Sequence, residues 1–370
     1  MTSAPIATAP VDTSATTDAL TERLFAAAIA ALELETVHLG DRLGYYKSLR
    51  ESGPINPAAF AKATGTADRY AREWLEQQAS AGFITVDDSA APEQDRRYSL
   101  PAGYDAVLVD PVSPNYMPWA AAWAVACAQP MDAIVEAFKT GGGVPWEAYG
   151  EAGVRAQAAG SRPNFVHSLA SEWLPGVPGL AERLQSGEGA RVADVATGGG
   201  WAAIEMARAF PGIKVDGLDL DSASIALAND NLRGSGVEDR VTFQVRDAGD
   251  PQLAGKYDLV TIFEAVHDMS HPVEALRGCK GLLAPGGVFL IMDENVDDEF
   301  RAPGTDYERL LYGFSVLTCL PAGMDAPGAV GTGTVIRPSK LREYAKEAGF
   351  SEVIDLPIAN DFFRFYQLLP

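Results

Sequence analysis

The run from Arg191 to Trp201, RVADVATGGGW, joins an apolar segment, an acidic residue and three consecutive glycines. Ala202–Phe210 then has the spacing of a helix. Glycines between a strand and a helix let main-chain N–H groups approach a ligand without hindrance from Cβ atoms, at the positive end of the helix dipole. The run therefore predicts a site for an anionic or nucleotide-like ligand.

The glycines alone do not choose between cofactors. Gly198, Gly200 and Ala203 also satisfy the loose G-x-G-x-x-A pattern of dinucleotide-binding proteins. An NAD enzyme is therefore one hypothesis until the following strand ends are considered.

Acidic residues close the next two expected strands. Lys214–Leu220 carries Asp219 at its end, where a second parallel strand presents a carboxylate to ribose hydroxyls. Val241–Asp247 ends at Asp247, and Ala248 follows it. That pair is suited to hold an adenine edge through a carboxylate and a backbone N–H.

A fourth expected strand, Tyr257–Phe263, is followed by Glu264, His267 and Asp268, and then by a helix that begins near Pro272. The carboxyl ends of parallel strands meet at one edge of a sheet, so all four strand ends should converge on one crevice. His267 can accept a hydroxyl proton there because imidazole titrates near neutrality.

These segments together resemble a class I S-adenosylmethionine-dependent methyltransferase. The resemblance rests on VADVATGGG, GLDLD, VRDA, YDLVTIFEAVHDM and LLAPGGVFLIMDEN, and it covers residues 185–370. The acidic-x-Gly-x-Gly-x-Gly signature of that family maps onto Asp194, Ala196, Gly198 and Gly200. Alanine replaces its first glycine, which leaves open a shifted cofactor or a descendant that no longer methylates.

The segment Phe138–Asn164, FKTGGGVPWEAYGEAGVRAQAAGSRPN, resembles the helical segment that small-molecule O-methyltransferases of natural-product metabolism place over the acceptor pocket. Aromatic residues in and around this segment are suited to line such a pocket, and among them Trp146 is the candidate for contacting substrate. The resemblance also implies that His267, in the His-Asp pair with Asp268, is the general base.

A carboxylate should orient the imidazole of His267. Asp268 is adjacent in sequence, so its side chain is not expected directly behind the ring. Glu264, Asp293 and Glu294 are the candidates, the last two at the end of a fifth strand, Val288–Met292, and Glu294 is preferred.

No metal is expected. The three cysteines lack the short pair spacing of a zinc site or a disulfide framework. A magnesium site is the weaker alternative, with ligands from Asp268, Asp293 and Asn295.

The N-terminal part predicts a winged helix, whose expected helices and hairpin strands are Leu20–Leu39, Arg42–Leu49, Asn56–Thr64, Asp68–Ala81, Phe83–Val86 and Arg97–Leu100. A transcription regulator is therefore the alternative from another functional class. Its recognition helix should be basic, yet acidic residues offset Arg69 and Arg72 in Asp68–Ala81. The family resemblance implies instead that this domain pairs two subunits.

The C-terminal part distinguishes the two cofactors. A helix over Ser339–Ala348 precedes two strands, Glu352–Leu356 and Phe362–Leu369, whose short connection makes them antiparallel. An antiparallel strand at the end of a parallel nucleotide-binding sheet is typical of class I methyltransferases and generally absent from NAD-binding domains.

Composition limits the partners. A net charge of −21 is unfavourable for binding nucleic acid. The N-terminus lacks the features of a signal peptide, no apolar run reaches the length of a membrane span, and a cytoplasmic enzyme is expected. Between the domains, Tyr116–Phe138 and Phe165–Leu184 are expected to be helices, as is Tyr307–Met324 after the fifth strand.

The expected fold is α/β: a Rossmann-like, mostly parallel seven-stranded sheet with an antiparallel C-terminal strand, preceded by a winged-helix-like domain. The expected parts are a disordered tail, a dimerisation domain, a helical linker with pocket residues and a cofactor-binding domain, at residues 1–19, 20–105, 106–184 and 185–370. The predicted function is S-adenosylmethionine-dependent O-methylation of a small aromatic or polyketide-like metabolite by a homodimer. Hydroxylation, decarboxylation or pericyclic chemistry on the same fold is the alternative.

Overall fold

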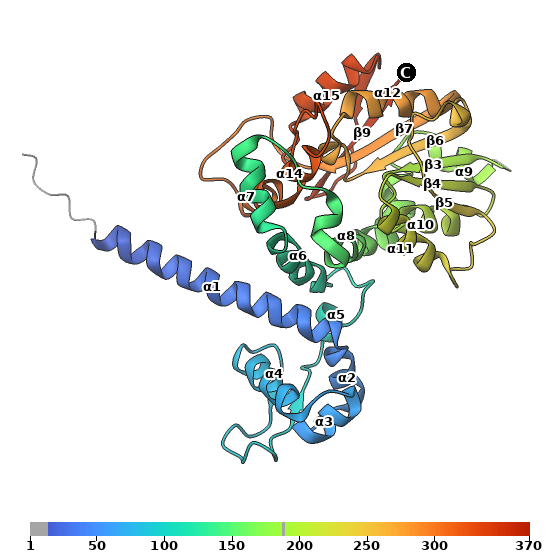
Figure 1. Cartoon of the computed structure of the whole chain (residues 1–370). Coiled ribbons are helices and arrows are strands. Elements are labelled where there is room, and N and C mark those ends of the chain that lie inside the picture. Colours follow the sequence, from blue (N-terminus) through green and yellow to red (C-terminus); the bar gives the residue numbers. More distant parts are fainter. Residues whose placement is uncertain (1–13, 187–188) are drawn as a thin grey trace, which may run out of the picture. The chain divides into compact units, whose positions relative to one another are not determined.

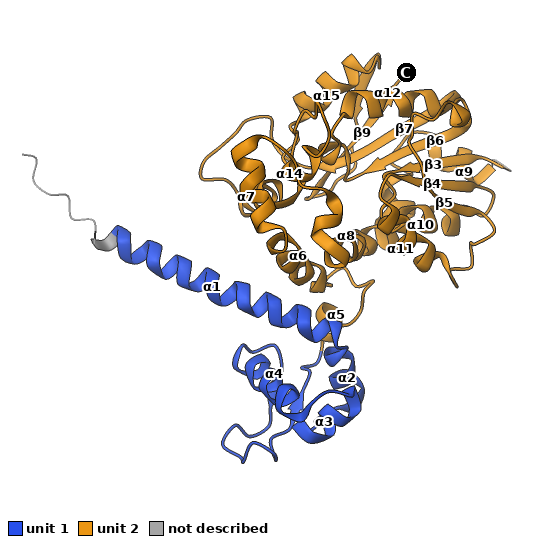
Figure 2. Ribbon diagram, viewed as in Figure 1, with its two compact units in different colours: residues 1–102 blue, residues 103–370 orange. Residues whose placement is uncertain are grey.

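A computed structural model describes residues 14–186 and 189–370. The chain divides into two compact units, residues 1–102 and 103–370, which Figure 2 shows in separate colours. Of the expected disordered tail, residues 1–13 lie outside the described residues. Residues 14–19 were expected in that tail, but they form the first turns of a helix. Adding a turn to an existing alanine-rich helix avoids the cost of nucleation, which explains the longer element.

Unit 1 is a small helical domain with a short hairpin (Figure 1). Its elements are α1 (Ser14–Arg42), α2 (Tyr45–Ser52), α3 (Pro57–Thr64), α4 (Asp68–Ser80), β1 (Thr85–Val86) and β2 (Tyr98–Ser99). Asn56 caps α3 by accepting the N–H of Ala59 at 2.9 Å. Tyr45 packs edge-on against Phe60 and Trp74, and these rings form the core of the unit. The helices and hairpin agree with the winged-helix prediction.

Unit 2 begins with helices that precede the sheet. They are α5 (Asp105–Leu108), α6 (Pro118–Ala128), α7 (Met131–Thr140), η1 (Trp146–Tyr149), α8 (Gly150–Asn164), the π-helix η2 (Phe165–Trp173) and α9 (Leu180–Ser186). The single helix expected over Tyr116–Phe138 is divided, because Pro130 cannot donate to a continuing helix. The helix expected over Phe165–Leu184 is likewise interrupted by a turn after Trp173.

A seven-stranded sheet forms the centre of unit 2, in the order β5-β4-β3-β6-β7-β9-β8. The strands are β3 (Arg191–Val195), β4 (Lys214–Asp219), β5 (Val241–Val245), β6 (Tyr257–Phe263), β7 (Leu283–Glu294), β8 (Glu352–Asp355) and β9 (Phe363–Leu369). The pairings from β5 to β7 are parallel, whereas β9 is antiparallel to both β7 and β8. The mostly parallel sheet with an antiparallel end, predicted from the sequence, is confirmed.

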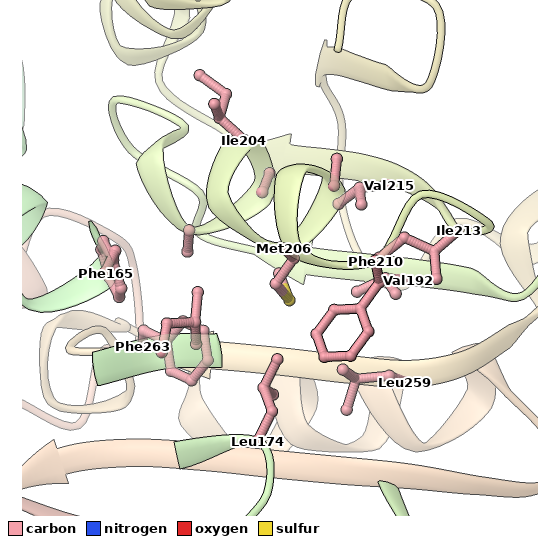
Figure 3. Packing of buried hydrophobic residues seen from close by; sticks show 14 of the residues in the cluster. Phe165, Leu174, Val192, Ile204, Met206, Phe210, Ile213, Val215, Leu259 and Phe263 are labelled. Atoms are coloured by element: carbon pink, nitrogen blue, oxygen red, sulfur yellow. The ribbon is translucent and has the colours of Figure 1, made fainter. Parts of the chain in front are cut away.

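Helices cover both faces of this sheet (Figure 1). The remaining helical elements are α10 (Trp201–Ala209), α11 (Ser222–Leu232), η3 (Pro251–Leu253), η4 (Val266–Asp268), α12 (Pro272–Leu282), α13 (Asp306–Phe314), the π-helix η5 (Ser315–Cys319), α14 (Leu320–Gly323) and α15 (Pro338–Glu347). Ile204 and Met206 of α10 share one buried cluster with Phe165 and Leu174 (Figure 3). Residues of α11 belong to the same cluster, and residues of α12 and α15 share another on the opposite face. Burial on both faces makes the central strands almost wholly apolar and fixes where their polar ends emerge.

Within residues 14–186 and 189–370, no helix is both long and apolar enough to cross a membrane.

Candidate active site

The glycine turn after β3 has an open backbone. Ala196, Gly198 and Gly200 all have positive φ angles, of 55°, 51° and 76°. A Cβ atom on Gly198 would meet nothing within 4 Å, whereas one on Gly200 would collide with the ring of Phe243. Gly200 is therefore required by packing, and Gly198 leaves space beside the main chain that a ligand can occupy.

Asp194 supports this turn from inside the protein. Its carboxylate is 2% exposed and accepts hydrogen bonds from the hydroxyls of Thr197 at 2.6 Å and Thr261 at 2.8 Å. Burial raises the pKa of Asp194 to about 6. The sequence assigned Asp194 to cofactor binding, and the structure places it beneath the glycine turn, bonded to Thr197 of that turn.

Asp219 and Asp247 lie at the ends of neighbouring strands, as the sequence predicts. The carboxylate of Asp219 accepts the N–H groups of Gly198 and Asp221, each at 2.9 Å, so it ties β4 to the glycine turn. Asp247 is exposed and accepts the N–H of Gly249 at 2.7 Å, while Ala248 beside it is buried. The carboxyl edge of the sheet thus carries two carboxylates with surface that a ligand can reach.

Glu264 ends β6 in a strained conformation, with a φ of +52°. Its pKa is raised well above the usual value by burial and by the nearby Glu294 carboxylate. Burial also raises the pKa of Glu294, to about 7. The hydroxyl of Tyr307, from α13, donates a hydrogen bond to the carboxylate of Glu294. Two protonatable carboxylates therefore lie together at the end of β6 and β7.

His267 is buried beside β7, and Asp293 lies directly behind it. The Nδ1 atom of His267 is 2.6 Å from Oδ1 of Asp293, and both side chains are almost fully buried. The preference for Glu294 as the orienting carboxylate is wrong, because successive side chains of a strand point to opposite faces. Asp293 points to His267, and Glu294 points to Tyr307.

The other ring nitrogen of His267 faces two further polar groups. Nε2 is 3.4 Å from Oδ1 of Asp268, and the ligand atoms of His267, Asp268 and Cys319 all lie within 4.8 Å of one another. Burial lowers the pKa of His267, but the carboxylates of Asp268 and Asp293 outweigh that effect and raise it well above its usual value. The imidazole is therefore a strong proton acceptor, held in one orientation.

Trp146 belongs to an aromatic group beside this cluster. Its ring lies 6.0 Å from that of Trp123 and 5.8 Å from that of Tyr149. The hydroxyl of Tyr149 donates a hydrogen bond to the carbonyl of Leu317 at 3.0 Å. Leu317 belongs to the π-helix that also carries Cys319. The aromatic group and the His267 cluster are thus built on the same segment.

Three residues near these groups were not singled out from the sequence. Arg162 of α8 lies 3.8 Å over the Trp201 ring, next to Gly200, and its Nε has no hydrogen-bond partner. Tyr307 and Cys319 lie in the insertion after β7, far from their partners in the sequence. An arginine in an ordinary helix gives no sequence signal, and neither does a lone cysteine.

Two of the three alternative magnesium ligands have other partners. Oδ1 of Asn295 accepts a hydrogen bond from the guanidinium of Arg364 at 3.1 Å, and Oδ1 of Asp293 is hydrogen-bonded to His267. A hollow of about 330 Å³ lies elsewhere, between η3 and α12, and its lining includes Ala248, Glu274 and Arg277. His267 is not part of that lining.

Two families match parts of the chain. The family described as "Methyltransferase domain" matches residues 186–327, and the "Rv2258c-like winged HTH domain" matches residues 30–109. The second match confirms the winged helix predicted for the N-terminal part.

Curated relatives match the C-terminal part. The ubiquinone biosynthesis O-methyltransferase of Cronobacter sakazakii is 32% identical over 192 residues, which cover 50% of this chain and 72% of that protein. The protein of the same name from Marinobacter nauticus is 31% identical over 166 residues, or 44% of this chain and 63% of the relative. The chain thus spans somewhat less than two thirds of that relative's length.

Solved structures share the whole fold. The mitomycin 7-O-methyltransferase MmcR is 19% identical, with a TM-score of 0.67 over 96% of this chain and 99% of that one. Human N-acetylserotonin methyltransferase, solved with S-adenosylmethionine, is 16% identical, with a TM-score of 0.68 over 95% and 97%. With the sheet order, the glycine turn and the curated relatives, these matches show that the chain belongs to the S-adenosylmethionine-dependent methyltransferases.

Proposed function

We propose that this enzyme methylates a hydroxyl oxygen of a small aromatic or polyketide-like metabolite, with His267 as the general base. The observation that carries the proposal is the buried pair of His267 and Asp293, joined at 2.6 Å at the carboxyl edge of the sheet. A base oriented from behind can take a proton from an acceptor at its second nitrogen, Nε2, which lies 3.4 Å from Oδ1 of Asp268. The C. sakazakii, M. nauticus and MmcR relatives are named for O-methylation, which supports oxygen as the nucleophile.

The residues at the sheet edge fit the cofactor. When bound, S-adenosylmethionine supplies a methyl group already activated on a sulfonium. The space beside Gly198 admits a ligand close to the main chain, and the carboxylate of the half-buried Asp219 suits ribose hydroxyls. Asp247 and the N–H of Ala248 suit an adenine edge, and Glu264, which follows β6, is assigned to the same ligand.

Arg162 is a further residue that fits the cofactor. Its guanidinium stacks on Trp201, the residue that follows the glycine turn, and its Nε has no partner. A guanidinium is the group best suited to bind a carboxylate. We assign Arg162 to the carboxylate of the cofactor's amino-acid tail.

The base acts by holding and moving one proton. Asp293 fixes the ring and stabilises its charged form, and Asp268 contributes negative charge on the Nε2 side. As the acceptor oxygen attacks, its proton passes to Nε2 of His267. Only the unprotonated ring can accept it, and the pKa of His267 is raised, so turnover should rise with pH through a range above the ordinary pKa of histidine. Most of the remaining acceleration comes from alignment of the two ligands.

The acceptor is assigned to the aromatic group that adjoins the base. Trp123 packs edge-on against both Trp146 and Phe314, at 6.0 Å and 5.6 Å. Trp146 is half-buried, so part of its ring can face a planar, apolar ligand. This is the support for an aromatic acceptor.

A role in DNA recognition is not favoured by the winged helix. On α4, Arg69 pairs with Glu73 and Arg72 pairs with Glu93. Such internal pairing leaves little positive potential for a phosphate backbone. We propose instead that unit 1 joins two copies of the chain, because α1 carries large apolar side chains that are exposed in a single chain.

The full-length protein tests this proposal directly. Calorimetric titration should show tight binding of S-adenosylhomocysteine and none of NAD. Transfer of labelled methyl from S-adenosylmethionine to a panel of phenols and hydroxyquinones should yield methyl ethers, and His267→Ala should lower turnover by about 10²- to 10⁴-fold while S-adenosylhomocysteine still binds.

His271→Ala is the matched control, because His271 only precedes α12 and makes no side-chain cap hydrogen bond. Unchanged turnover in His267→Ala would eliminate the assigned base. Conversion of an acceptor to a product without the labelled methyl would favour the non-methylating alternative.

A further inference from the structure

We propose that His267, Asp268 and Cys319 bind one zinc-type divalent cation, and that this ion switches the enzyme off. The three ligand atoms lie within 4.8 Å of one another, although Cys319 is on a different helix from the other two. The sequence predicts no such site, since the cysteines lack metal-binding spacing.

The donor set suits zinc. Imidazole nitrogen, thiolate sulfur and carboxylate oxygen are its usual ligands, and three protein ligands with one open position form a common arrangement. With zinc–ligand bonds of about 2.0–2.3 Å, tetrahedral ligands lie about 3.3–3.8 Å apart. The distance of 3.4 Å between Nε2 of His267 and Oδ1 of Asp268 already meets this value. The distances from the Cys319 thiol to the other two ligand atoms are at most 4.8 Å, so the Cys319 side chain must move by about 1 Å to reach this range.

One buried carboxylate oxygen at the cluster lacks a hydrogen bond, although it lies 3.4 Å from Nε2 of His267. Oδ1 of Asp268 has no hydrogen bond and is shielded from solvent. The hydroxyl of Thr334, a residue 3% exposed, lies beside the Cys319 thiol and interacts with it. Buried polar atoms without partners carry a free-energy cost. A cation bound between the three side chains would supply the missing partner of Asp268.

The side chains that would orient the metal ligands are also in place. Metal-bound histidines usually donate their other ring nitrogen to a carboxylate, and Nδ1 of His267 is 2.6 Å from Asp293. Cys319 is held through its neighbour Thr318, whose hydroxyl lies 3.1 Å from Sγ of Cys127. The ligands therefore need little reorganisation.

Binding would require the thiol to lose its proton. Burial, followed by the Asp268 carboxylate, raises the pKa of Cys319 to about 12, so without metal it is a thiol. A bound cation reverses this effect because it favours the thiolate.

The consequence for catalysis rests on the proposed function. Nε2 of His267 cannot accept an acceptor proton while it holds a metal ion. The same ion would also neutralise Asp268. Methyl transfer should therefore stop at zinc concentrations that fill the site, and a chelator should restore it.

The test uses full-length protein treated with a chelator and then titrated with Co²⁺ as a spectroscopic probe. We expect one Co²⁺ per chain, a sulfur-to-cobalt charge-transfer band, tetrahedral visible bands, and displacement by Zn²⁺. Cys319→Ser should abolish the charge-transfer band and weaken Zn²⁺ binding at least about tenfold, as even outer-shell substitutions do. Asp268→Asn should weaken binding similarly and keep the band. The control is Cys279→Ala, which removes a buried thiol on α12 that lies outside the cluster and should change neither.

Circular dichroism and S-adenosylhomocysteine binding would establish that each variant is folded. Absence of Co²⁺ binding to the wild type would overturn the inference, as would a charge-transfer band that persists in Cys319→Ser. These readouts do not use methyl transfer. If the protein binds cobalt through a thiolate but methylates no acceptor, the metal site is upheld and the proposed function is defeated. If the protein is an active methyltransferase but binds no metal, the proposed function is upheld and the metal site is defeated.

Discussion

His267 and Asp293 meet through Nδ1 and Oδ1 at 2.6 Å, although one follows β6 and the other lies near the end of β7. The parallel pairing of these strands places both residues at one edge of the sheet. Oδ1 of Asp293 also accepts the N–H of Glu294 at 3.0 Å, which fixes the carboxylate itself. The imidazole is consequently oriented by the main structural element of the domain rather than by a loop.

Asp293→Asn should lower kcat by about 100-fold, because an amide can hold the ring but cannot stabilise its charged form. KM and the affinity for S-adenosylhomocysteine should change by less than about threefold, since Asp293 is a positioning residue. Steady-state kinetics and calorimetry measure these quantities. Glu294→Gln is the comparison, and a greater loss of kcat there than in Asp293→Asn would reverse the assignment.

Arg162→Ala should weaken S-adenosylhomocysteine binding by about 10- to 100-fold, the loss expected for a charged hydrogen bond of about 1.5–3 kcal/mol. The affinity for methylthioadenosine, which lacks the amino-acid tail, should stay within about twofold. Calorimetry with both ligands separates the two effects. Arg155→Ala is the control on the same helix, where Arg155 pairs with Glu151. Equal losses for both ligands would show that Arg162 only supports the fold near Trp201.

Ala196→Gly should leave the affinity for S-adenosylhomocysteine within about threefold. Ala196 already has a φ of 55°, the left-handed conformation that a glycine would adopt there. Glycine relieves about 1–2 kcal/mol of strain in the folded protein but adds about 0.4–1 kcal/mol of conformational freedom to the unfolded chain. The free energy of unfolding should therefore rise by no more than about 1–2 kcal/mol. Ala196→Val should cost about 1–3 kcal/mol, because a β-branched residue fits this conformation poorly. Chemical denaturation would measure both, and a stable valine variant would contradict the strain argument.

Much of the fold could be predicted because it depends on local sequence patterns. Apolar runs that end in Asp219 and Asp247 indicate parallel strands, and the closely spaced C-terminal strands indicate the antiparallel end of the sheet. These features depend on periodicity and on connection length. The divided helix at Pro130 was missed because the apolar spacing continues across it.

The side chains of the candidate site were harder to predict. Choosing between Asp293 and Glu294 requires knowing which face of β7 each occupies, and a shift of one residue exchanges those faces. Cys319 reaches His267 only because α13 and a π-helix return the chain to the sheet edge. Neither relationship is encoded by spacing along the sequence.

Asp194→Asn should change how stability depends on pH. Burial raises the pKa of Asp194 from 3.8 to about 6, so the native state binds this proton more tightly than the unfolded state. That contribution is complete below about pH 4 and is lost as pH rises through about 6. Two pKa units correspond to about 3 kcal/mol, so the wild type should lose about this much stability relative to Asp194→Asn between pH 4 and 7.

Asp216→Asn provides a comparison of opposite sign. Burial acts to raise the pKa of Asp216, but hydrogen bonds led by those of Thr242 and Arg191 outweigh burial and lower it. Its contribution to stability is therefore present above the unfolded pKa and is lost only as the solution becomes more acidic. Urea denaturation between pH 4 and 7 should show the decline for Asp194 alone. A flat difference for Asp194→Asn would mean that its carboxylate is ionised as readily in the folded protein as in the unfolded one.

Replacing apolar side chains of α1 with charged ones should separate two copies of the chain. The helix carries Leu20, Leu24, Phe25 and Leu32, and each is more than half exposed in a single chain. At about 3.6 residues per turn these four side chains fall within an arc of about 140°, so they form one apolar face, which is normally buried against a partner. A second copy of α1 and its neighbours would cover them.

We therefore expect the wild type to be a dimer by light scattering and sedimentation, and the double substitution Phe25→Glu with Leu32→Glu to be a monomer. Glu22→Lys changes charge on the same helix without removing apolar surface, so it should remain dimeric. Because S-adenosylhomocysteine is assigned to residues of unit 2, the monomer should still bind it. A dimer that survives both glutamates would place the interface elsewhere, and a monomeric wild type would leave the apolar surface of α1 to a different partner.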